Sequence, residues 1–138
     1  MQRVSITAGE FTFEGMFESD DAPETCAWFA ENLPVVSKVI HARWSGEAVW
    51  VPLGDLVSGL TQENHTAHPS RGDILFYPGG ISETEILIVY GSASFASKMG
   101  TLAGNHFITI TEGRERLPEF GEHILWHGAL DIVFSSIT

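Results

Sequence analysis

The histidine at position 106 carries the most accessible chemistry at neutral pH, because an unperturbed imidazole gains or loses a proton between about pH 5 and 8. It lies near the start of NHFITITEG, a segment that predicts a strand over residues 105–113. In this strand His106 shares a face with Ile108 and Ile110, and we expect that row to point into the interior of the fold. His106 is therefore a candidate acid or base; the competing interpretation is a histidine bonded only to a carbonyl or to water.

Two carboxylates precede or begin the apolar segment EILIVYG. Glu83 and Glu85 share a face if the strand already begins at residue 83. Paired carboxyls divide acid and base roles when burial separates their pKa values, whereas a solvated loop end gives them no such role. Glu85 is the stronger candidate, because a charge leading into an apolar strand needs solvent or a partner. Arg43, Lys98 and His106 are the candidate partners.

Aromatic and amide side chains at strand ends complete the candidate ligand-binding set. Tyr77 and Tyr90 end neighbouring strands and Trp44 ends another, which favours an aromatic rim with hydrogen-bonding tips; core packing explains the same pattern. Asn105 could bind a polar ligand or adopt the left-handed conformation after Gly104. No glycine-rich segment has the spacing of a phosphate-binding loop.

The two histidine pairs lack the signatures of a metal site. His123 and His127 are one turn apart on a predicted helix, but the HExxH signature is absent and the pair lies in the last turn of that helix. His65 and His68 lie near Glu63 in a segment that reads as an exposed loop. We therefore expect no metal and no cofactor.

The charge of the chain excludes whole classes of partner. Eighteen acidic residues against seven basic ones give a net charge of -11, which repels nucleic-acid phosphates and anionic membranes. The single cysteine, Cys26, cannot form an intramolecular disulfide, and its position on an apolar helix stripe favours a core role over a nucleophile. No segment has the apolar character of a secretory signal or a membrane span. We expect a cytoplasmic protein.

Alternating apolar residues predict strands over most of the chain. These strands span residues 4–8, 11–17, 35–44, 47–53, 72–78, 84–91, 105–113 and 129–136. The helical spacing of Cys26, Phe29, Ala30 and Leu33 predicts a helix that Pro34 stops, and a second short helix is expected over residues 118–127. Residues 54–71 read as a loop.

Many short strands with few helices favour a mainly β fold in which a closed barrel of about eight strands is accompanied by two short helices, since closure removes exposed sheet edges. One domain is expected over residues 1–138, because neither a linker nor a repeat interrupts the pattern. The length suits a single packed core.

Two blocks of sequence resemble a known fold family. RGDILFYPGG followed by EILIVYG is similar to the paired strands of the bacterial cyclophilin-like barrel proteins. PGGISETEILIVYG and FASKMGTLAGNHF resemble a family of uncharacterised bacterial proteins assigned to that fold, over nearly the whole chain. The resemblance implies a cyclophilin-like barrel but no reaction. The Phe-His-Arg and Gln-Gly-Gly-Asp motifs of prolyl isomerases are absent, so that activity is not expected.

The leading functional expectation is the binding of a small polar molecule at one mouth of the barrel. The residues expected to line that mouth are Trp44, Tyr77, Glu85, Tyr90 and His106. One alternative is an enzyme for a small metabolite, with His106 or Glu85 as acid or base and Arg43 as a clamp for an anionic group. A structural interaction module is the other alternative. A homo-oligomer is also expected, because soluble proteins commonly form symmetric homo-oligomers.

Overall fold

The computed structural model describes residues 2–137. The strands are β1 (Arg3–Ala8), β2 (Phe11–Phe17), β3 (Val35–His41), β4 (Gly46–Gly54), β5 (His65–Thr66), β6 (Asp73–Tyr77), β7 (Thr84–Ala93), β8 (Ala96–Ser97), β9 (Gly100–Thr101), β10 (Gly104–Glu112) and β11 (Leu130–Ile137). The helices are α1 (Pro23–Glu31) and α2 (Leu117–His127), with the short 3-10 turn Arg114–Arg116 leading into α2. The predicted strands and both predicted helices are confirmed within a few residues.

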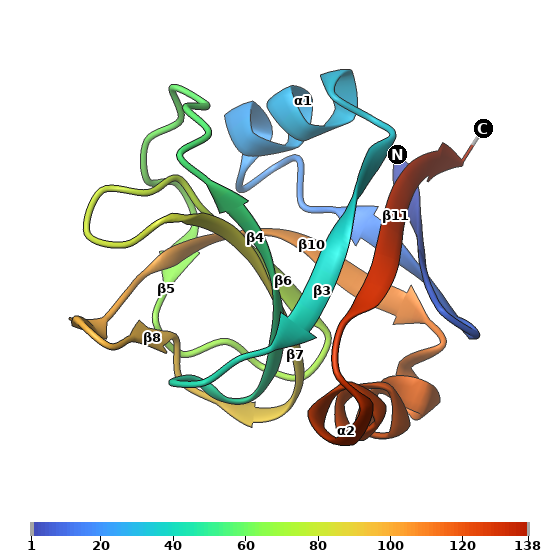
Figure 1. The fold of residues 1–138 in the computed structure, drawn as a ribbon. Helices are drawn as coiled ribbons and strands as arrows, with labels where there is room; N and C mark the ends of the chain where they lie inside the picture. The colour runs from blue at the N-terminus through green and yellow to red at the C-terminus, as the bar shows by residue number, and fades with distance from the viewer. Residues whose placement is uncertain (1, 138) are drawn as a thin grey trace.

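Nine of the strands form one sheet in the order β2-β1-β11-β3-β4-β7-β6-β10-β5. A further pairing between β10 and β2 closes this sheet, so eight strands form a ring and the short β5 only extends from β10. All the pairings are antiparallel. The expected closed barrel of eight strands with two helices is confirmed (Figure 1).

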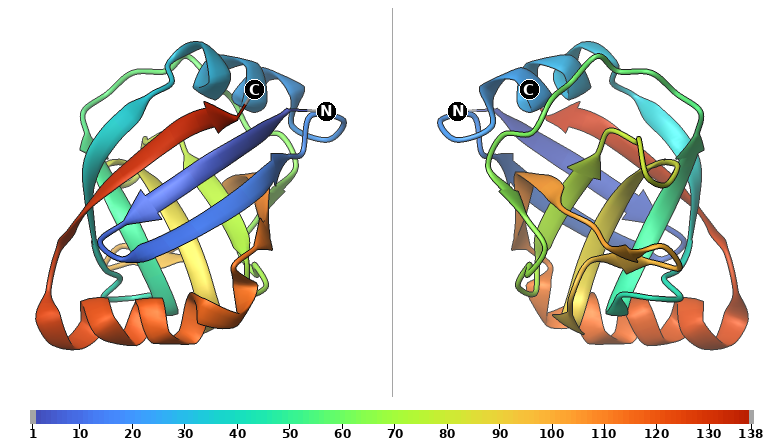
Figure 2. Two further views of the ribbon diagram at one scale, coloured as in Figure 1. Left: turned by 90° about the vertical axis from the view of Figure 1, so that its right-hand side faces the viewer. Right: turned by 90° about the vertical axis from the view of Figure 1, so that its left-hand side faces the viewer.

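The two helices lie at opposite ends of the barrel (Figure 2). Helix α1 starts at Pro23, whose missing N–H costs nothing in a first turn, and it buries Cys26 and Phe29. Helix α2 buries Leu117 and Ile124 among others and ends at a glycine. Among residues 2–137, neither helix is long and apolar enough to cross a membrane.

Aromatic side chains fill the inside of the barrel. Phe107 is fully buried, with its ring 5.0 Å from that of Phe29 and 6.1 Å from that of Phe76. At the α2 end the ring of Tyr90 lies so close to Gly121 that a Cβ on this glycine would be 2.2 Å from it. The interior is thus a packed core with helices against it.

A second apolar cluster lies outside the barrel wall. Residues 94–103, which include the β8–β9 hairpin, cross the outer face of β4, β7 and β6 (Figure 2, right). Phe95 and Leu102 from this segment pack against Leu75, Leu87 and Val89 of the wall. As a result, every residue of β7 from Thr84 to Tyr90 is buried. This outer layer is what creates the candidate site.

Candidate functional site

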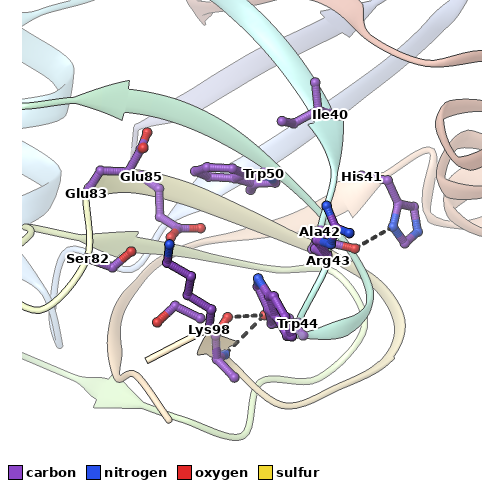
Figure 3. Close-up of a pocket in the computed structure, with 13 residues that line it drawn as sticks. Ile40, His41, Ala42, Arg43, Trp44, Trp50, Ser82, Glu83, Glu85 and Lys98 are labelled. Atoms are coloured by element: carbon purple, nitrogen blue, oxygen red, sulfur yellow. Dashed lines mark hydrogen bonds between the residues drawn. The ribbon is translucent and has the colours of Figure 1, made fainter. Parts of the chain in front are cut away.

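A pocket of about 400 Å³ lies on the outer side of the barrel, between the wall and the β8–β9 hairpin (Figure 3). Its apolar lining comes from β3 and β4 and the turn between them, and its charged lining from that turn, the start of β7 and the hairpin. The residues that matter chemically are Arg43, Trp44, Trp50, Glu83, Glu85 and Lys98. A site of this size suits a small molecule.

Glu85 is the most unusual group in the pocket. In the sheet it pairs with Pro52 of β4 on one side and Tyr77 of β6 on the other, which places its side chain on the outer face of the wall. The residue is only 6% exposed, yet among residues 2–137 its carboxyl makes no hydrogen bond and no ion pair. Figure 3 shows it pointing into the pocket between Trp50 and Lys98.

The surroundings of Glu85 keep its carboxyl neutral. Burial, and secondarily the negative charge of Glu83, raise the pKa of Glu85 from its ordinary value of 4.5 to about 8. At pH 7 most of the molecules therefore carry a protonated carboxyl that can donate a hydrogen bond or a proton into the pocket. Glu83 itself is exposed on the loop that precedes β7.

Two cations stand at the rim of the pocket. Arg43 follows the end of β3, and its guanidinium carbon lies 5.9 Å from the centre of the Trp44 ring. Lys98 lies at the tip of the β8–β9 hairpin and reaches toward the Glu85 side of the pocket (Figure 3). Both side chains are exposed, and neither forms an ion pair within residues 2–137.

Tyr77 supports the site without lining this pocket. Its hydroxyl accepts hydrogen bonds from the backbone N–H groups of Ile81 at 3.0 Å and Ser82 at 3.3 Å. Its ring packs edge-on against Phe95, with the ring centres 5.8 Å apart. Tyr77 therefore fixes the loop before β7, which carries Glu83, and it lines a different pocket together with Ile81 and Leu102.

Tyr90 belongs to the opposite face of β7. Because side chains alternate along a strand, Tyr90 points inward while Glu85 points outward. Its hydroxyl lies 2.7 Å from Nε2 of His41, whose Nδ1 is 2.7 Å from the carbonyl of Ala42. Burial and the charges of Glu47 and Glu122 raise the pKa of Tyr90. The predicted rim position of Tyr90 is wrong, because α2 covers that end of the barrel.

His106 lies on the outside of β10, away from the pocket. A bulge in the β6–β10 pairing between His106 and Ile108 breaks the alternation, so that Phe107 and Ile108 are both buried and His106 turns outward. There its Nε2 lies 2.9 Å from Oγ1 of Thr109 and 3.4 Å from Asp73. Ile108 and Ile110 face the core as predicted, but the expected inward position of His106 is wrong, since a bulge is not visible in a regular alternation.

Asn105 is a structural residue. It is fully buried, and its amide nitrogen donates to Oγ1 of Thr25 and to the carbonyl of Thr61, each at 3.0 Å. Its amide oxygen accepts from the backbone N–H of Glu63 at 3.2 Å. Asn105 thus ties the loop before β5 to α1, and it lies outside the pocket.

Of the predicted site residues, four are brought together and four are not. Arg43, Trp44, Glu83 and Glu85 line one pocket. Tyr77, Tyr90, Asn105 and His106 lie elsewhere, so the expected convergence at a barrel mouth is wrong. Sequence reasoning missed Trp50 and the covering hairpin. Their signal was the unbroken run ILIVY, which indicates a strand buried on both faces and hence a layer outside the wall.

Within residues 2–137 no group of three or more His, Cys, Asp or Glu side chains is arranged to hold a metal ion. The rings of His123 and His127 face each other with their centres 4.7 Å apart. Cys26 is buried, its thiol donates to the carbonyl of Phe107 at 3.2 Å, and burial raises its pKa to about 11. The predicted core role of Cys26 is confirmed.

Two solved structures share the fold of this chain. McbB, solved in complex with tryptophan, superposes with a TM-score of 0.74 at 17% identity over 96% of this chain, which spans only 44% of the length of McbB. The hypothetical protein AF2241 from Archaeoglobus fulgidus gives a TM-score of 0.66 at 17% identity, covering 97% of this chain and 93% of its own. No curated protein matches. Residues 4–136 match one family model, and the chain therefore belongs to the protein family of unknown function DUF3830.

Proposed function

We propose that this protein binds a small polar molecule in the pocket between the barrel wall and the β8–β9 hairpin. One observation carries the proposal: Glu85, only 6% exposed, lines a pocket of about 400 Å³ with a carboxyl that forms no ion pair within residues 2–137. Within residues 2–137 no side-chain polar atom is both buried and unbonded, so the oxygens of Glu85 are accessible and a ligand in the pocket can hydrogen-bond them. The indole rings of Trp44 and Trp50 provide a flat apolar surface beside this carboxyl.

The four tryptophans of the chain make this proposal testable at the level of single residues. Trp44 and Trp50 line the pocket, whereas Trp28 packs against Phe76 and Trp126 is 74% exposed on α2. In nitrogen-15 NMR spectra each indole N–H gives its own signal. A library of small polar metabolites is added to the labelled protein, and we expect at least one member to shift the signals of Trp44 and Trp50 while those of Trp28 and Trp126 stay in place.

The variant Glu85→Gln sharpens the assignment, with Glu31→Gln as its control. Glu31 is an exposed residue at the end of α1 and does not line the pocket. For a ligand that hydrogen-bonds the Glu85 carboxyl, the pH dependence of the affinity is lost in the first variant and kept in the second. If no member of the library moves the Trp44 and Trp50 signals, or if ligands move only those of Trp28 and Trp126, the pocket is not the binding site.

A second candidate function, an acid–base enzyme at the same pocket, is favoured by one specific observation. The pKa of about 8 leaves Glu85 protonated at neutral pH, which is the state that a general acid requires. His106 takes no part in this candidate, because it lies on a different part of the wall. Turnover of a bound metabolite that Glu85→Gln abolishes without loss of binding would favour the enzyme over the pure binding protein.

A cytoplasmic location and a homo-oligomer are further parts of the proposal. The single cysteine supports the first. The exposed side chains of Leu125 and Trp126 on α2 support the second, with exposed fractions of 49% and 74%. Light scattering of the purified protein tests the oligomer directly: we expect a mass above that of one chain, which Trp126→Asp lowers to the monomer.

A further inference from the structure

The basic residues of this acidic chain are distributed unevenly between paired and unpaired positions. Four of the seven are bonded to protein groups: Arg3, Lys38, Arg114 and Arg116. Within residues 2–137, Arg43, Arg71 and Lys98 are bonded to none by their side chains. Two of these three line the pocket. In a chain of net charge -11, two cations without an ion pair beside one pocket favour an anionic ligand there.

We propose that the ligand is a small carboxylic acid with one negative charge, held by Lys98 and Arg43, hydrogen-bonded by Glu85 and packed with its apolar body against Trp44 and Trp50. This inference rests on the proposed function and names its ligand class. Arg and Lys are the side chains that bind carboxylates. Trp44 and Trp50 give the apolar body of such an acid a surface to cover.

Glu85 fits this ligand because its protonated carboxyl donates a hydrogen bond that a carboxylate oxygen accepts. The charged and titratable groups around it come from separate elements: Tyr77 from β6, Glu83 from the loop before β7, Lys98 from the hairpin and Arg43 from the turn after β3. The hydroxyl of Tyr77 is already bonded to the backbone of the loop. The negative charge of Glu83 opposes a second negative charge on the ligand, which favours a carboxylate over a phosphate dianion.

The remaining titratable group near the pocket, His41, is already bonded. Its imidazole points away from the other side chains in Figure 3, and its two nitrogens contact Tyr90 and the carbonyl of Ala42. Burial and the charge of Glu83 raise the pKa of Glu85, and within residues 2–137 neither Arg43 nor Lys98 forms an ion pair. The two cations therefore remain available to a ligand while Glu85 stays protonated.

Three probes with the same phenyl ring and chain but different charges test the proposal: 3-phenylpropanoate, 3-phenylpropan-1-ol and 3-phenylpropan-1-amine. Binding is followed at pH 7 and pH 9 through the indole signals of Trp44 and Trp50. We expect the carboxylate to bind at least about tenfold more tightly than the other two probes at pH 7. With a pKa of about 8, its affinity falls about tenfold at pH 9, because Glu85 must take up a proton to bind it.

Variants with matched charge changes separate binding from general electrostatics. Lys98→Gln and Arg43→Gln each lower the affinity for 3-phenylpropanoate about tenfold. Arg71→Gln, which removes an unpaired cation outside the pocket, leaves its affinity unchanged. Glu85→Gln keeps a hydrogen-bond donor, so it binds the carboxylate at pH 7 and loses the fall in affinity at pH 9.

Three results overturn the inference, and they differ from the result that overturns the proposed function. Tighter binding of the amine, with an affinity that rises toward pH 9, identifies a cation site at Glu85. Equal affinities for the three probes show that the charge of the ligand's terminal group does not contribute to binding. Failure of all three probes to move the Trp44 and Trp50 signals rejects the carboxylate class. The proposed function itself falls only if the whole metabolite library leaves these signals in place.

Discussion

The two faces of β7 are both buried, but different parts of the molecule cover them. The inner face, with Ile86, Ile88 and Tyr90, belongs to a closed aromatic core with helices against its ends. The outer face, with Leu87 and Val89, is covered only by residues 94–103, and this thinner layer leaves a pocket at Glu85. The closed barrel therefore supplies the stability, whereas the site depends on the segment that covers the outside of the barrel wall.

Removing an aromatic ring from the inner side gives the largest loss of stability. Phe107→Ala leaves a cavity between the rings of Phe29 and Phe76, and the free energy of unfolding falls by about 3–5 kcal/mol. Urea denaturation followed by circular dichroism measures this. Val36→Ala is the control, since Val36 is 69% exposed and changes stability by less than about 0.5 kcal/mol. A loss below about 1 kcal/mol in Phe107→Ala would contradict a packed interior.

The next largest effect is the pH dependence that Glu85 imparts to folding. Between its ordinary pKa of 4.5 and its folded pKa of about 8, the folded state binds more protons than the unfolded state. The contribution of Glu85 to stability is therefore complete below pH 4.5 and is lost as the pH rises through about 8. Because one pKa unit corresponds to about 1.4 kcal/mol, the loss amounts to a few kcal/mol.

Glu85→Gln removes this dependence. Its stability matches that of the parent protein at pH 4 and exceeds it at pH 9, where the parent protein carries a largely buried charge. Urea midpoints at several pH values provide the measurement, and Glu31→Gln corrects for the general effect of removing one negative charge. Parallel stability curves for Glu85→Gln and the parent protein would mean that Glu85 titrates as an exposed carboxyl.

A change in the outer layer costs less stability and acts locally. Leu102 is 2% exposed and packs in the cluster outside the wall, so Leu102→Ala lowers the free energy of unfolding by about 2–3 kcal/mol. Hydrogen exchange then accelerates in residues 94–103, while amides of β1 and β2 keep their protection. Leu125→Ala, at a half-exposed position of α2, serves as the control. Uniform acceleration over the whole chain would show that the two layers unfold together.

The smallest effect on stability comes from the pocket rim. Trp44 is 55% exposed, so Trp44→Ala changes the free energy of unfolding by less than about 0.5 kcal/mol. The same substitution removes an apolar surface of the pocket and weakens the binding of 3-phenylpropanoate. Trp126→Ala is the matched control on α2 and leaves binding unchanged. Equal affinities of the two variants would place the probe outside the pocket.

The fold was predictable because its local signals agree. The alternation in β1, β2 and β11 and the helical spacing of Cys26 and Phe29 all lead to the observed elements. Glu85 was also predictable, since a charge at the start of an apolar strand requires a special environment. The sequence named Arg43, Lys98 and His106 as candidate partners of Glu85 but could not choose among them. The choice depends on how the β8–β9 hairpin folds back over the wall.

The rest of the site could not be read from the sequence for specific physical reasons. The bulge that turns His106 outward adds one residue to a regular pattern and leaves no signal of its own. Tyr90 became a core residue because Gly121, far along the chain, lets α2 approach its ring. Tyr77, Tyr90 and His106 do not converge. Tyr90 belongs to the core inside the barrel, whereas Tyr77 and His106 lie outside it on different strands.

The most direct test of the account is a titration of the Glu85 carboxyl itself. Carbon-13 labelling of the glutamate side chains, with Glu85→Gln to assign the signal, follows the carboxyl carbon from pH 5 to pH 10. A midpoint near 8 is the predicted result, and it would establish a protonated carboxyl facing the outer pocket at neutral pH. A midpoint near the ordinary value of 4.5 would contradict the account, because Glu85 would then be a solvated charge.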